Sequence, residues 1–260
     1  MCPSLFQDLA KVDDRIRAAA RISLFLDFDG TLVPLRPDPA EVRLSEEVRA
    51  TLIRLMRNDR TVTTMISGRS LADLCSRVAL DGLIYAGNHG MEISGRQLHF
   101  IEPSAEIRRE ELRALSDKIA AGLRDVEGVF VEYKGLTTSI HYRSAAVRDL
   151  NRIETLVRGA VAVAPNLFRL DSGKMTFEII PRAFWNKGAA ARWINEHLGN
   201  GGALSIYLGD DNTDEDAFCA LPDGITVKVG AFAATSAKYH LTDPSAVHEF
   251  LNWLANHEPA

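Results

Sequence analysis

Two carboxylates, a glycine and a hydroxyl directly follow an apolar run near the start of the chain. Residues 24–26 are Leu-Phe-Leu, and Asp27, Asp29, Gly30 and Thr31 come next. Carboxylates crowded at the end of a buried strand repel each other and resist the loss of water, so folding alone does not favour them. They make sense if a cation and a reaction use them. A carboxylate can attack a phosphoryl group without losing a proton first, and a second carboxylate can donate and accept protons.

More polar groups follow other apolar runs or begin a predicted helix. Because the carboxyl ends of parallel strands share one edge of a sheet, we expect these groups to converge with Asp27. Two like charges about 4 Å apart cost on the order of 4 kcal/mol at an effective dielectric near 20, so clustered carboxylates require a cation. Oxygen ligands without His or Cys favour a hard ion, and we predict Mg²⁺. Together with a lysine and a serine hydroxyl, this composition predicts phosphoryl transfer. The groups are Ser67-Gly68-Arg69, Asn88-His89, Asn186-Lys187-Gly188, Asp210, Asp211 and Asp214.

The elements that must position these groups can be predicted from periodicity and breakers. Strands are expected up to Asp27 and at 61–66, 83–86, 204–208 and 225–229, with helices from Ser45, from Ser70 and at 186–198 and 244–255. Strands that alternate with helices indicate a parallel sheet. Between them lie a helix at 105–124, a hairpin of 129–133 and 137–142, a helix at 145–160, and strands at 167–170 and 175–180.

The middle of the chain therefore breaks the alternation and is predicted to be an inserted domain. We expect an α/β fold, with a Rossmann-like parallel-sheet core formed by residues 1–104 and 183–260. The insertion, residues 105–182, is expected to be a small α+β cap with the order αββαββ.

Composition excludes several classes of protein. A net charge of −5 and a pI near 5.8 argue against nucleic acid as a partner. The scattered Cys2, Cys75 and Cys219 form no CxxC motif, no apolar run is long enough to span a membrane, and no GxGxxG follows a strand. We therefore expect a cytoplasmic protein, a monomer without nucleic-acid or membrane partners, and not a dinucleotide-dependent oxidoreductase.

The chain resembles the haloacid dehalogenase superfamily, whose four motifs match Asp27–Leu32, Ser67, Lys187 and Gly209–Asp214 in this order. Longer strings are similar to trehalose-6-phosphate phosphatases, with Asn88 standing where that family more often has serine. These strings are Ile66–Arg69, Gly87–Glu92, Glu132–Gly135, His141–Arg143, Gly173-Lys174 with Glu178, Asn186–Gly188 and Gly209–Asp216.

This resemblance implies a Mg²⁺-dependent sugar-phosphate phosphatase that acts on trehalose 6-phosphate through an aspartyl phosphate. It implies that Asp27 is the nucleophile, that Asp29 is the general acid and base, and that Ser67 and Lys187 hold the phosphate. The metal would be bound by Asp27, the backbone carbonyl of Asp29 and Asp210, with support from Asp214. Substrate-binding residues would be Gly68, Arg69, Asn88 and His89 in the core and Glu132, Lys134, Arg143, Lys174 and Glu178 in the cap, which would close over the core.

Other interpretations stay open at this point. Asp210, Asp211 and Asp214 could be acids of a helix N-terminus, Ser67 a turn residue, His89 a loop imidazole, and the cap charges an ordinary solvated surface. The substrate could be sucrose phosphate, glucosylglycerol phosphate, mannosyl-phosphoglycerate or a pseudo-disaccharide phosphate. A hexose phosphomutase or a non-catalytic sugar-phosphate sensor would be a different class of protein.

Overall fold

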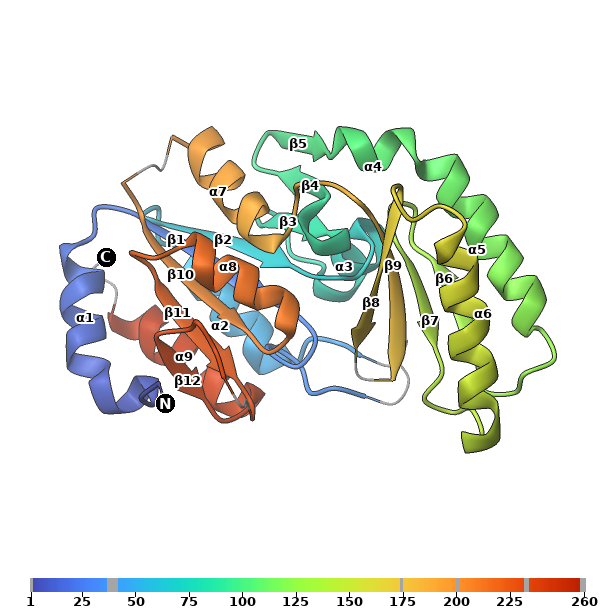
Figure 1. Cartoon of the computed structure of the whole chain (residues 1–260). Helices are drawn as coiled ribbons and strands as arrows, with labels where there is room; N and C mark the ends of the chain where they lie inside the picture. The colour runs from blue at the N-terminus through green and yellow to red at the C-terminus, as the bar shows by residue number, and fades with distance from the viewer. Residues whose placement is uncertain (1, 37–41, 174, 200–201, 232–233, 258–260) are drawn as a thin grey trace. The chain divides into compact units, whose positions relative to one another are not determined.

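The computed structural model describes residues 2–36, 42–173, 175–199, 202–231 and 234–257 of the 260-residue chain. The chain folds into two compact units, Met1–Phe100 with Trp185–Ala260, and Ile101–Phe184 (Figure 1). The predicted residue bounds of the core and cap domains remain a prediction. Among the helices in these ranges, none is long and apolar enough to cross a membrane.

The first unit is built on an eight-stranded sheet of order β12-β11-β10-β1-β2-β3-β4-β5. The pairs from β12 to β3 are parallel, and β4 is antiparallel to β3. The strand order reverses beside β1, which is where open parallel sheets bind their ligands. The strands are β1 (Ile22–Asp27), β2 (Thr61–Ile66), β3 (Ile84–Gly87), β4 (Glu92–Gly95), β5 (Leu98–Ile101), β10 (Leu204–Gly209), β11 (Ile225–Val229) and β12 (Tyr239–Leu241).

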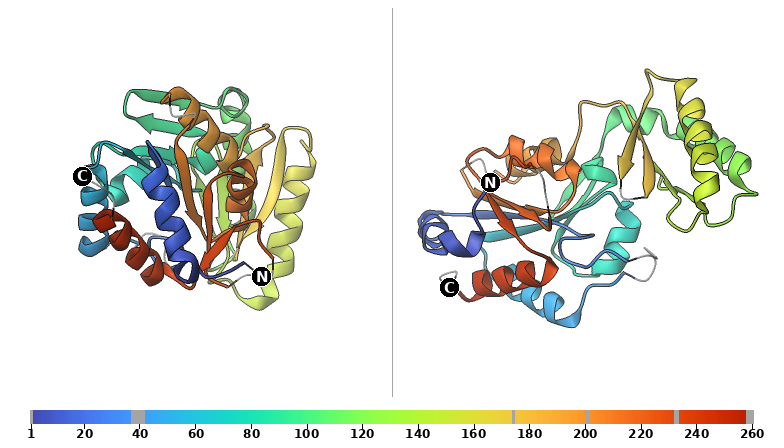
Figure 2. Two further views of the ribbon diagram at one scale, coloured as in Figure 1. Left: turned by 90° about the vertical axis from the view of Figure 1, so that its left-hand side faces the viewer. Right: turned by 60° about the horizontal axis from the view of Figure 1, so that its bottom comes forward.

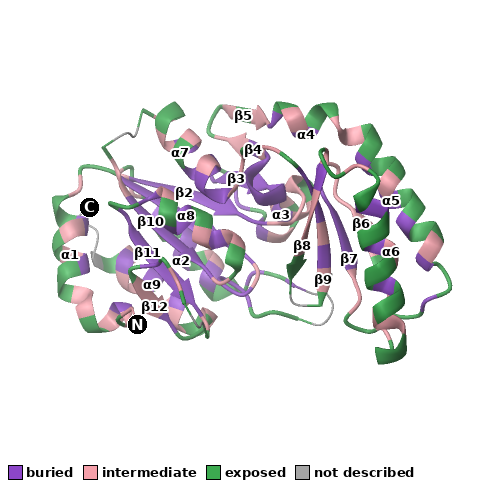
Figure 3. Ribbon diagram, viewed as in Figure 1, coloured by how far each residue is buried: buried purple, intermediate pink, exposed green. Residues whose placement is uncertain are grey.

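Helices cover both faces of this sheet and bury its central strands (Figure 3). Along β1, Leu24 and Leu26 pack with α1, α2, α3 and α9, whereas Phe25 packs with α7 and α8. Figure 2 shows α2 and α9 on one side of the sheet and α7 and α8 on the other. Side chains alternate along a strand, so Asp27 lies on the same side as Phe25, toward α7. The helices are α1 (Leu9–Ala18), α2 (Glu46–Met56), α3 (Leu71–Val78), α7 (Lys187–His197), α8 (Glu215–Ala220) and α9 (Pro244–His257).

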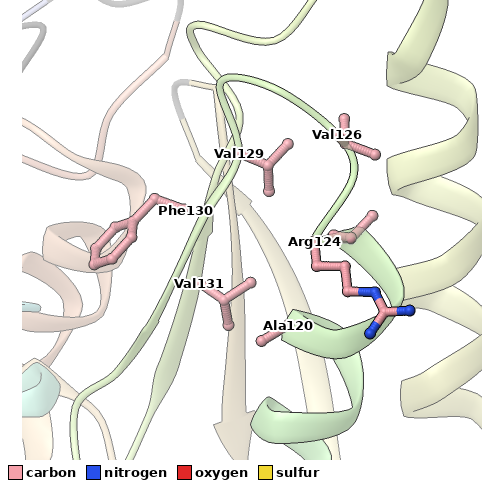
Figure 4. A pocket seen from close by; sticks show the side chains of 7 residues that line it. Ala120, Arg124, Val126, Val129, Phe130 and Val131 are labelled. Atoms are coloured by element: carbon pink, nitrogen blue, oxygen red, sulfur yellow. The ribbon is translucent and has the colours of Figure 1, made fainter.

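The second unit is a four-stranded antiparallel sheet of order β6-β7-β9-β8, with α5 and α6 packed on one face. On that face a pocket of about 260 Å³ lies between the end of α5 and β6. Figure 4 shows Val129 and Val131 pointing into this pocket and the ring of Phe130 pointing away from it. The elements are α4 (Pro103–Ile107), α5 (Arg109–Leu123), β6 (Phe130–Tyr133), β7 (Thr138–His141), α6 (Leu150–Ala162), β8 (Phe168–Gly173) and β9 (Thr176–Pro181).

The predicted fold class is confirmed, and the differences are local. The strands at 61–66 and 225–229 have their predicted bounds, and β1 ends at Asp27 as predicted. The helix predicted at 105–124 is divided into α4 and α5 at Arg108, whose φ and ψ are −97° and 10°. The helix predicted at 145–160 is α6 (Leu150–Ala162), which begins five residues later. The short strands β4, β5 and β12 were not predicted.

Candidate active site

The side chains of Asp27 and Lys187 meet at the carboxyl end of β1. Asn186 caps α7 by accepting a hydrogen bond from the N–H of Ala189 at 2.8 Å, and this makes Lys187 the first residue of the helix. Lys187 Nζ donates to Asp27 Oδ1 at 2.8 Å. Both residues are buried, at 2% and 4% exposure. A cation at a helix N-terminus opposes the helix dipole, so the ion pair rather than the helix accounts for this lysine.

Asp214 is the second partner of Lys187 and is fully buried. Its Oδ1 accepts hydrogen bonds from Lys187 Nζ and from the hydroxyl of Tyr207, each at 2.8 Å. Its Oδ2 accepts from the N–H of Asp211 at 2.9 Å. These three donors provide hydrogen bonds to both oxygens of the buried carboxylate. Asp214 therefore both orients Lys187 and closes the turn that carries Asp210 and Asp211.

The charges of this cluster act on one another strongly. Burial raises the pKa of Asp27 well above its usual range, the carboxylates of Asp214 and Asp210 raise it further, and Lys187 opposes the rise. Burial by itself lowers the pKa of Lys187, but Asp214 and Asp27 raise it above its usual value, so this lysine stays charged. The permanent charge of Lys187 is what favours an ionised Asp27 in this buried place.

Asp210 completes a group of three carboxylates that could hold a cation. One carboxylate oxygen from each of Asp27, Asp210 and Asp214 lies within 4.8 Å of the other two. Gly30 permits this approach: its φ is +82°, and an added Cβ would lie 2.2 Å from Asp210 Oδ2. If all three carboxylates were ionised, they would carry more negative charge than Lys187 balances, and a divalent cation would offset the excess. An all-oxygen donor set of this kind fits Mg²⁺.

Asp29 has a different cationic partner from Asp27. Arg69 donates to it through two nitrogens, from Nε to Oδ2 at 2.6 Å and from Nη2 to Oδ1 at 2.7 Å. Arg69 also donates from Nη1 to Asp73 Oδ2 at 2.7 Å, and the same oxygen accepts from Arg77 Nε at 2.7 Å. A bidentate pair of this kind fixes the plane of the carboxylate. The structure thus pairs Arg69, predicted to bind substrate, with the predicted acid and base.

A strained turn follows β3 and packs against the loop after β2. Asn88 and His89 have φ values of +48° and +58°, which side-chain-bearing residues rarely adopt, and such strain is typical of functional sites. Asn88 is fully buried, and its Nδ2 donates to Glu92 Oε2 at 2.9 Å. The His89 ring lies against Gly68, where an added Cβ would be 2.7 Å from Cε1. Both predicted substrate-binding side chains are therefore part of the packed loop.

Ser67 lies at the end of β2 and is 2% exposed. Its hydroxyl accepts a hydrogen bond from the N–H of Arg69 at 3.2 Å, and its own N–H donates to Ala86 O at 2.9 Å. The first contact is that of a turn-forming serine. Its role in holding phosphate stays a prediction.

Known proteins resemble this chain in sequence. The family model described as trehalose-phosphatase matches residues 25–245. The chain is 34% identical to a trehalose 6-phosphate phosphatase of Zea mays over 275 residues, which cover 97% of this chain and 75% of the maize protein. The chain belongs to the trehalose-phosphatase family. The resemblance predicted from the four motifs is thereby confirmed, together with the enzyme class, because the named relatives are phosphatases.

Two further known proteins resemble this family member, and the chain covers different shares of their lengths. A trehalose-phosphate phosphatase of Mycobacterium ulcerans is 34% identical over 270 residues, which cover 98% of this chain and 66% of the mycobacterial protein. The C-terminal domain of a Candida albicans trehalose-6-phosphate phosphatase is 23% identical, with a TM-score of 0.83 and 98% of each chain covered. At that identity the structural likeness concerns the fold.

The second unit of this trehalose-phosphatase family member holds the other predicted substrate-binding residues. Lys134 Nζ donates to Glu178 Oε1 at 2.7 Å, and Glu132 Oε2 lies 2.9 Å from His141 Nε2. Arg143 is exposed in the turn that follows β7. Lys174 lies outside the described residues. The structure brings Lys134 and Glu178 into one ion pair, and Glu132 lies on the same sheet.

Sequence reasoning missed three residues that support the site. Tyr207 binds Asp214 from within β10, and Asp73 binds Arg69 from α3. Lys228, 4% exposed, donates from β11 to the carbonyl of Asp211 at 2.9 Å. A tyrosine and a lysine inside otherwise apolar strands were the available signals, because a buried polar side chain needs a partner.

Proposed function

We propose that this protein is a Mg²⁺-dependent phosphatase that hydrolyses trehalose 6-phosphate to trehalose and inorganic phosphate, with Asp27 as the nucleophile. The observation that carries the proposal is the buried Lys187, which contacts Asp27 and Asp214 at 2.8 Å each. Asp210 lies in the same carboxylate group. A site with one fixed cation and several carboxylates suits a reaction that moves a phosphoryl group.

Asp27 would attack the phosphorus atom directly. An ionised carboxylate needs no base to activate it, and Lys187 favours this ionised form against burial. A bond forms between Asp27 Oδ and phosphorus while the bond from phosphorus to the sugar oxygen breaks. Water then attacks the phosphorus of the aspartyl phosphate, which releases inorganic phosphate and restores Asp27.

Asp29 would serve the two proton transfers. It donates a proton to the departing sugar oxygen and later accepts one from the attacking water. The two contacts from Arg69 hold its carboxylate in one orientation. Because they engage both oxygens, at least one of them would have to open for Asp29 to carry the proton. Asp27 and Asp29 thus have separate cationic partners, which suits two carboxylates with separate tasks.

The carboxylates of Asp27 and Asp210 would hold the Mg²⁺, with Asp214 as the residue that fixes Lys187 beside them. The bound ion would neutralise charge on the phosphate oxygens. Asp214 is less suited as a ligand, since its two oxygens already accept three hydrogen bonds.

Asp210→Asn is expected to weaken Mg²⁺ binding about tenfold or more, because an amide carries no charge to offset that of the ion. Isothermal titration with MgCl₂ measures this directly, without any substrate. Asp59→Asn, an exposed aspartate of the same unit, is the matched control and should bind like the wild type. Equal affinities of the wild type and Asp210→Asn would remove Asp210 from the metal site.

The sugar would be recognised by Glu132, Lys134 and Glu178 of the second unit. Sugar hydroxyls both donate and accept hydrogen bonds, so carboxylates and an ammonium can pair with them directionally. A site built to bond hydroxyls also rejects esters that lack them, because its polar groups would then lose partners.

Release of inorganic phosphate from a panel of esters tests the proposed substrate. The panel contains trehalose 6-phosphate, sucrose phosphate, glucosylglycerol phosphate, mannosyl-phosphoglycerate and glucose 6-phosphate. We expect the highest kcat/KM for trehalose 6-phosphate and one phosphate released for each trehalose formed. A higher kcat/KM for another ester would replace the substrate, and phosphate transfer to a second sugar position would indicate a mutase.

A further inference from the structure

One face of the second sheet, opposite the face that packs on α5 and α6, carries polar side chains. Along β6, Val131 and Tyr133 pack with the helices, so Phe130, Glu132 and Lys134 face the other way. Figure 4 agrees, since the Phe130 ring points away from the pocket beside α5. Pairing between strands extends this face to the other strands. The polar face comprises Glu132, Lys134, Ser139, His141, Thr176 and Glu178.

Two glutamates of the polar face lie on different strands, Glu132 on β6 and Glu178 on β9, and each contacts neighbouring side chains. Glu132 and Glu178 pair in register with Ser139 from opposite sides, which places their Cα atoms about 10 Å apart. Glu178 Oε1 accepts from Lys134 Nζ at 2.7 Å and from Ser139 Oγ at 3.2 Å. Glu132 Oε2 lies 2.9 Å from His141 Nε2. Each carboxylate thus has one oxygen fixed by a side chain of the face.

The ring of His141 is itself held on several sides. Its Nδ1 lies 3.4 Å from Thr176 Oγ1, on the strand paired with β7. A ring with its proton on Nε2 donates to Glu132 and accepts from Thr176. The ring also stacks on Phe130, with centroids 5.9 Å apart and planes at 19°. A ring fixed in this way can hold the Glu132 carboxylate in one rotamer.

We propose that His141 is a positioning residue, which orients Glu132 to accept a hydrogen bond from a hydroxyl of the sugar. The inference rests on the proposed function, because it assigns Glu132 to the sugar of the substrate. A carboxylate oriented before binding loses less side-chain entropy when the hydroxyl arrives. The contribution of His141 should therefore appear with substrates that carry a sugar and vanish with a phosphate ester that has none.

His141→Phe is the decisive variant, because it keeps an aromatic ring beside Phe130 and removes both ring nitrogens. The substrates are trehalose 6-phosphate and p-nitrophenyl phosphate, which has no sugar. We expect kcat/KM for trehalose 6-phosphate to fall about tenfold, mainly through KM, with p-nitrophenyl phosphate changed by less than about twofold. His141→Gln, which keeps a donor, should restore most of the loss.

A double variant shows whether His141 acts through Glu132. Adding His141→Phe to Glu132→Gln should lower kcat/KM by less than about twofold further, since coupled residues do not contribute additively. Three outcomes would each overturn the inference. The double variant could lose kcat/KM by the product of the two single losses, or His141→Phe could lose equally on both substrates, or it could lose nothing with trehalose 6-phosphate.

Failure of the proposed substrate gives a different result. The wild type would then show no preference for trehalose 6-phosphate over p-nitrophenyl phosphate. In that case the same variants are compared on the sugar phosphate that the wild type prefers, and the same outcomes decide the role of His141.

Discussion

Asp27→Asn is expected to lower kcat for phosphate release from trehalose 6-phosphate by about 10⁴-fold or more. The amide keeps the shape of the side chain but is too weak a nucleophile to form the phosphorylated intermediate. The fold should persist, because the substitution removes one of three crowded carboxylates and leaves Lys187 bonded to Asp214. Phosphate release and thermal melting followed by circular dichroism give the two measurements.

Asp59→Asn is again the matched control, with activity expected within about twofold of the wild type. Turnover of Asp27→Asn close to that of the wild type would remove Asp27 as the nucleophile. A melting temperature far below that of the wild type would instead assign Asp27 a structural role, since lost activity would then follow from lost fold.

Lys187→Met is expected to lower the free energy of unfolding by about 3–5 kcal/mol, in addition to abolishing turnover. The lysine is 2% exposed and is the shared partner of Asp27 and Asp214. Without it, both carboxylates stay buried and lose their shared cation, which is costly in a low-dielectric environment. Urea unfolding followed by circular dichroism, in buffer without divalent cations, measures the loss.

The double variant Lys187→Met with Asp214→Asn separates charge from packing. Asp214→Asn removes one of the two carboxylates that lose their cation in Lys187→Met. It should therefore recover part of the lost stability, because the effects of substituting two residues of one ion pair are not additive. The opposite outcome is additivity, in which Asp214→Asn lowers the free energy of unfolding of Lys187→Met by as much as it lowers that of the wild type. Additivity would show that burial of unpaired charge is not the cause of the loss. Arg152→Gln, in an exposed ion pair with Asp125, should change stability by less than about 1 kcal/mol.

Sequence patterns predicted the central strands well and the edges of the sheet poorly. β1, β2, β10 and β11 consist mostly of apolar or β-branched residues, because helices bury them on both faces. β4 and β12 have four and three residues, too few for alternation to be distinguished from a loop. The break at Arg108 was missed for a related reason, since helical periodicity continues through a one-residue change of backbone angle.

The candidate site was likewise predicted only in part. The sequence pointed to Asp27, Lys187, Asp210 and Asp214 as one group, and the structure brings them together. It did not predict that Arg69 would take Asp29 as its partner. Nothing in a pattern of residue types tells a substrate-binding arginine from one that holds a carboxylate.

By itself the sequence determined the class of chemistry, because the reacting groups stand in short strings, such as Asp27–Thr31, whose spacing follows from local backbone geometry. Only the tertiary structure decided which cation serves which carboxylate. Lys187 lies 160 residues from Asp27, and Arg69 lies 40 residues from Asp29. Such pairings depend on the order of strands in the sheet and on which face each side chain occupies. His141 and Glu132 became partners in the same way, through the register of β6 and β7.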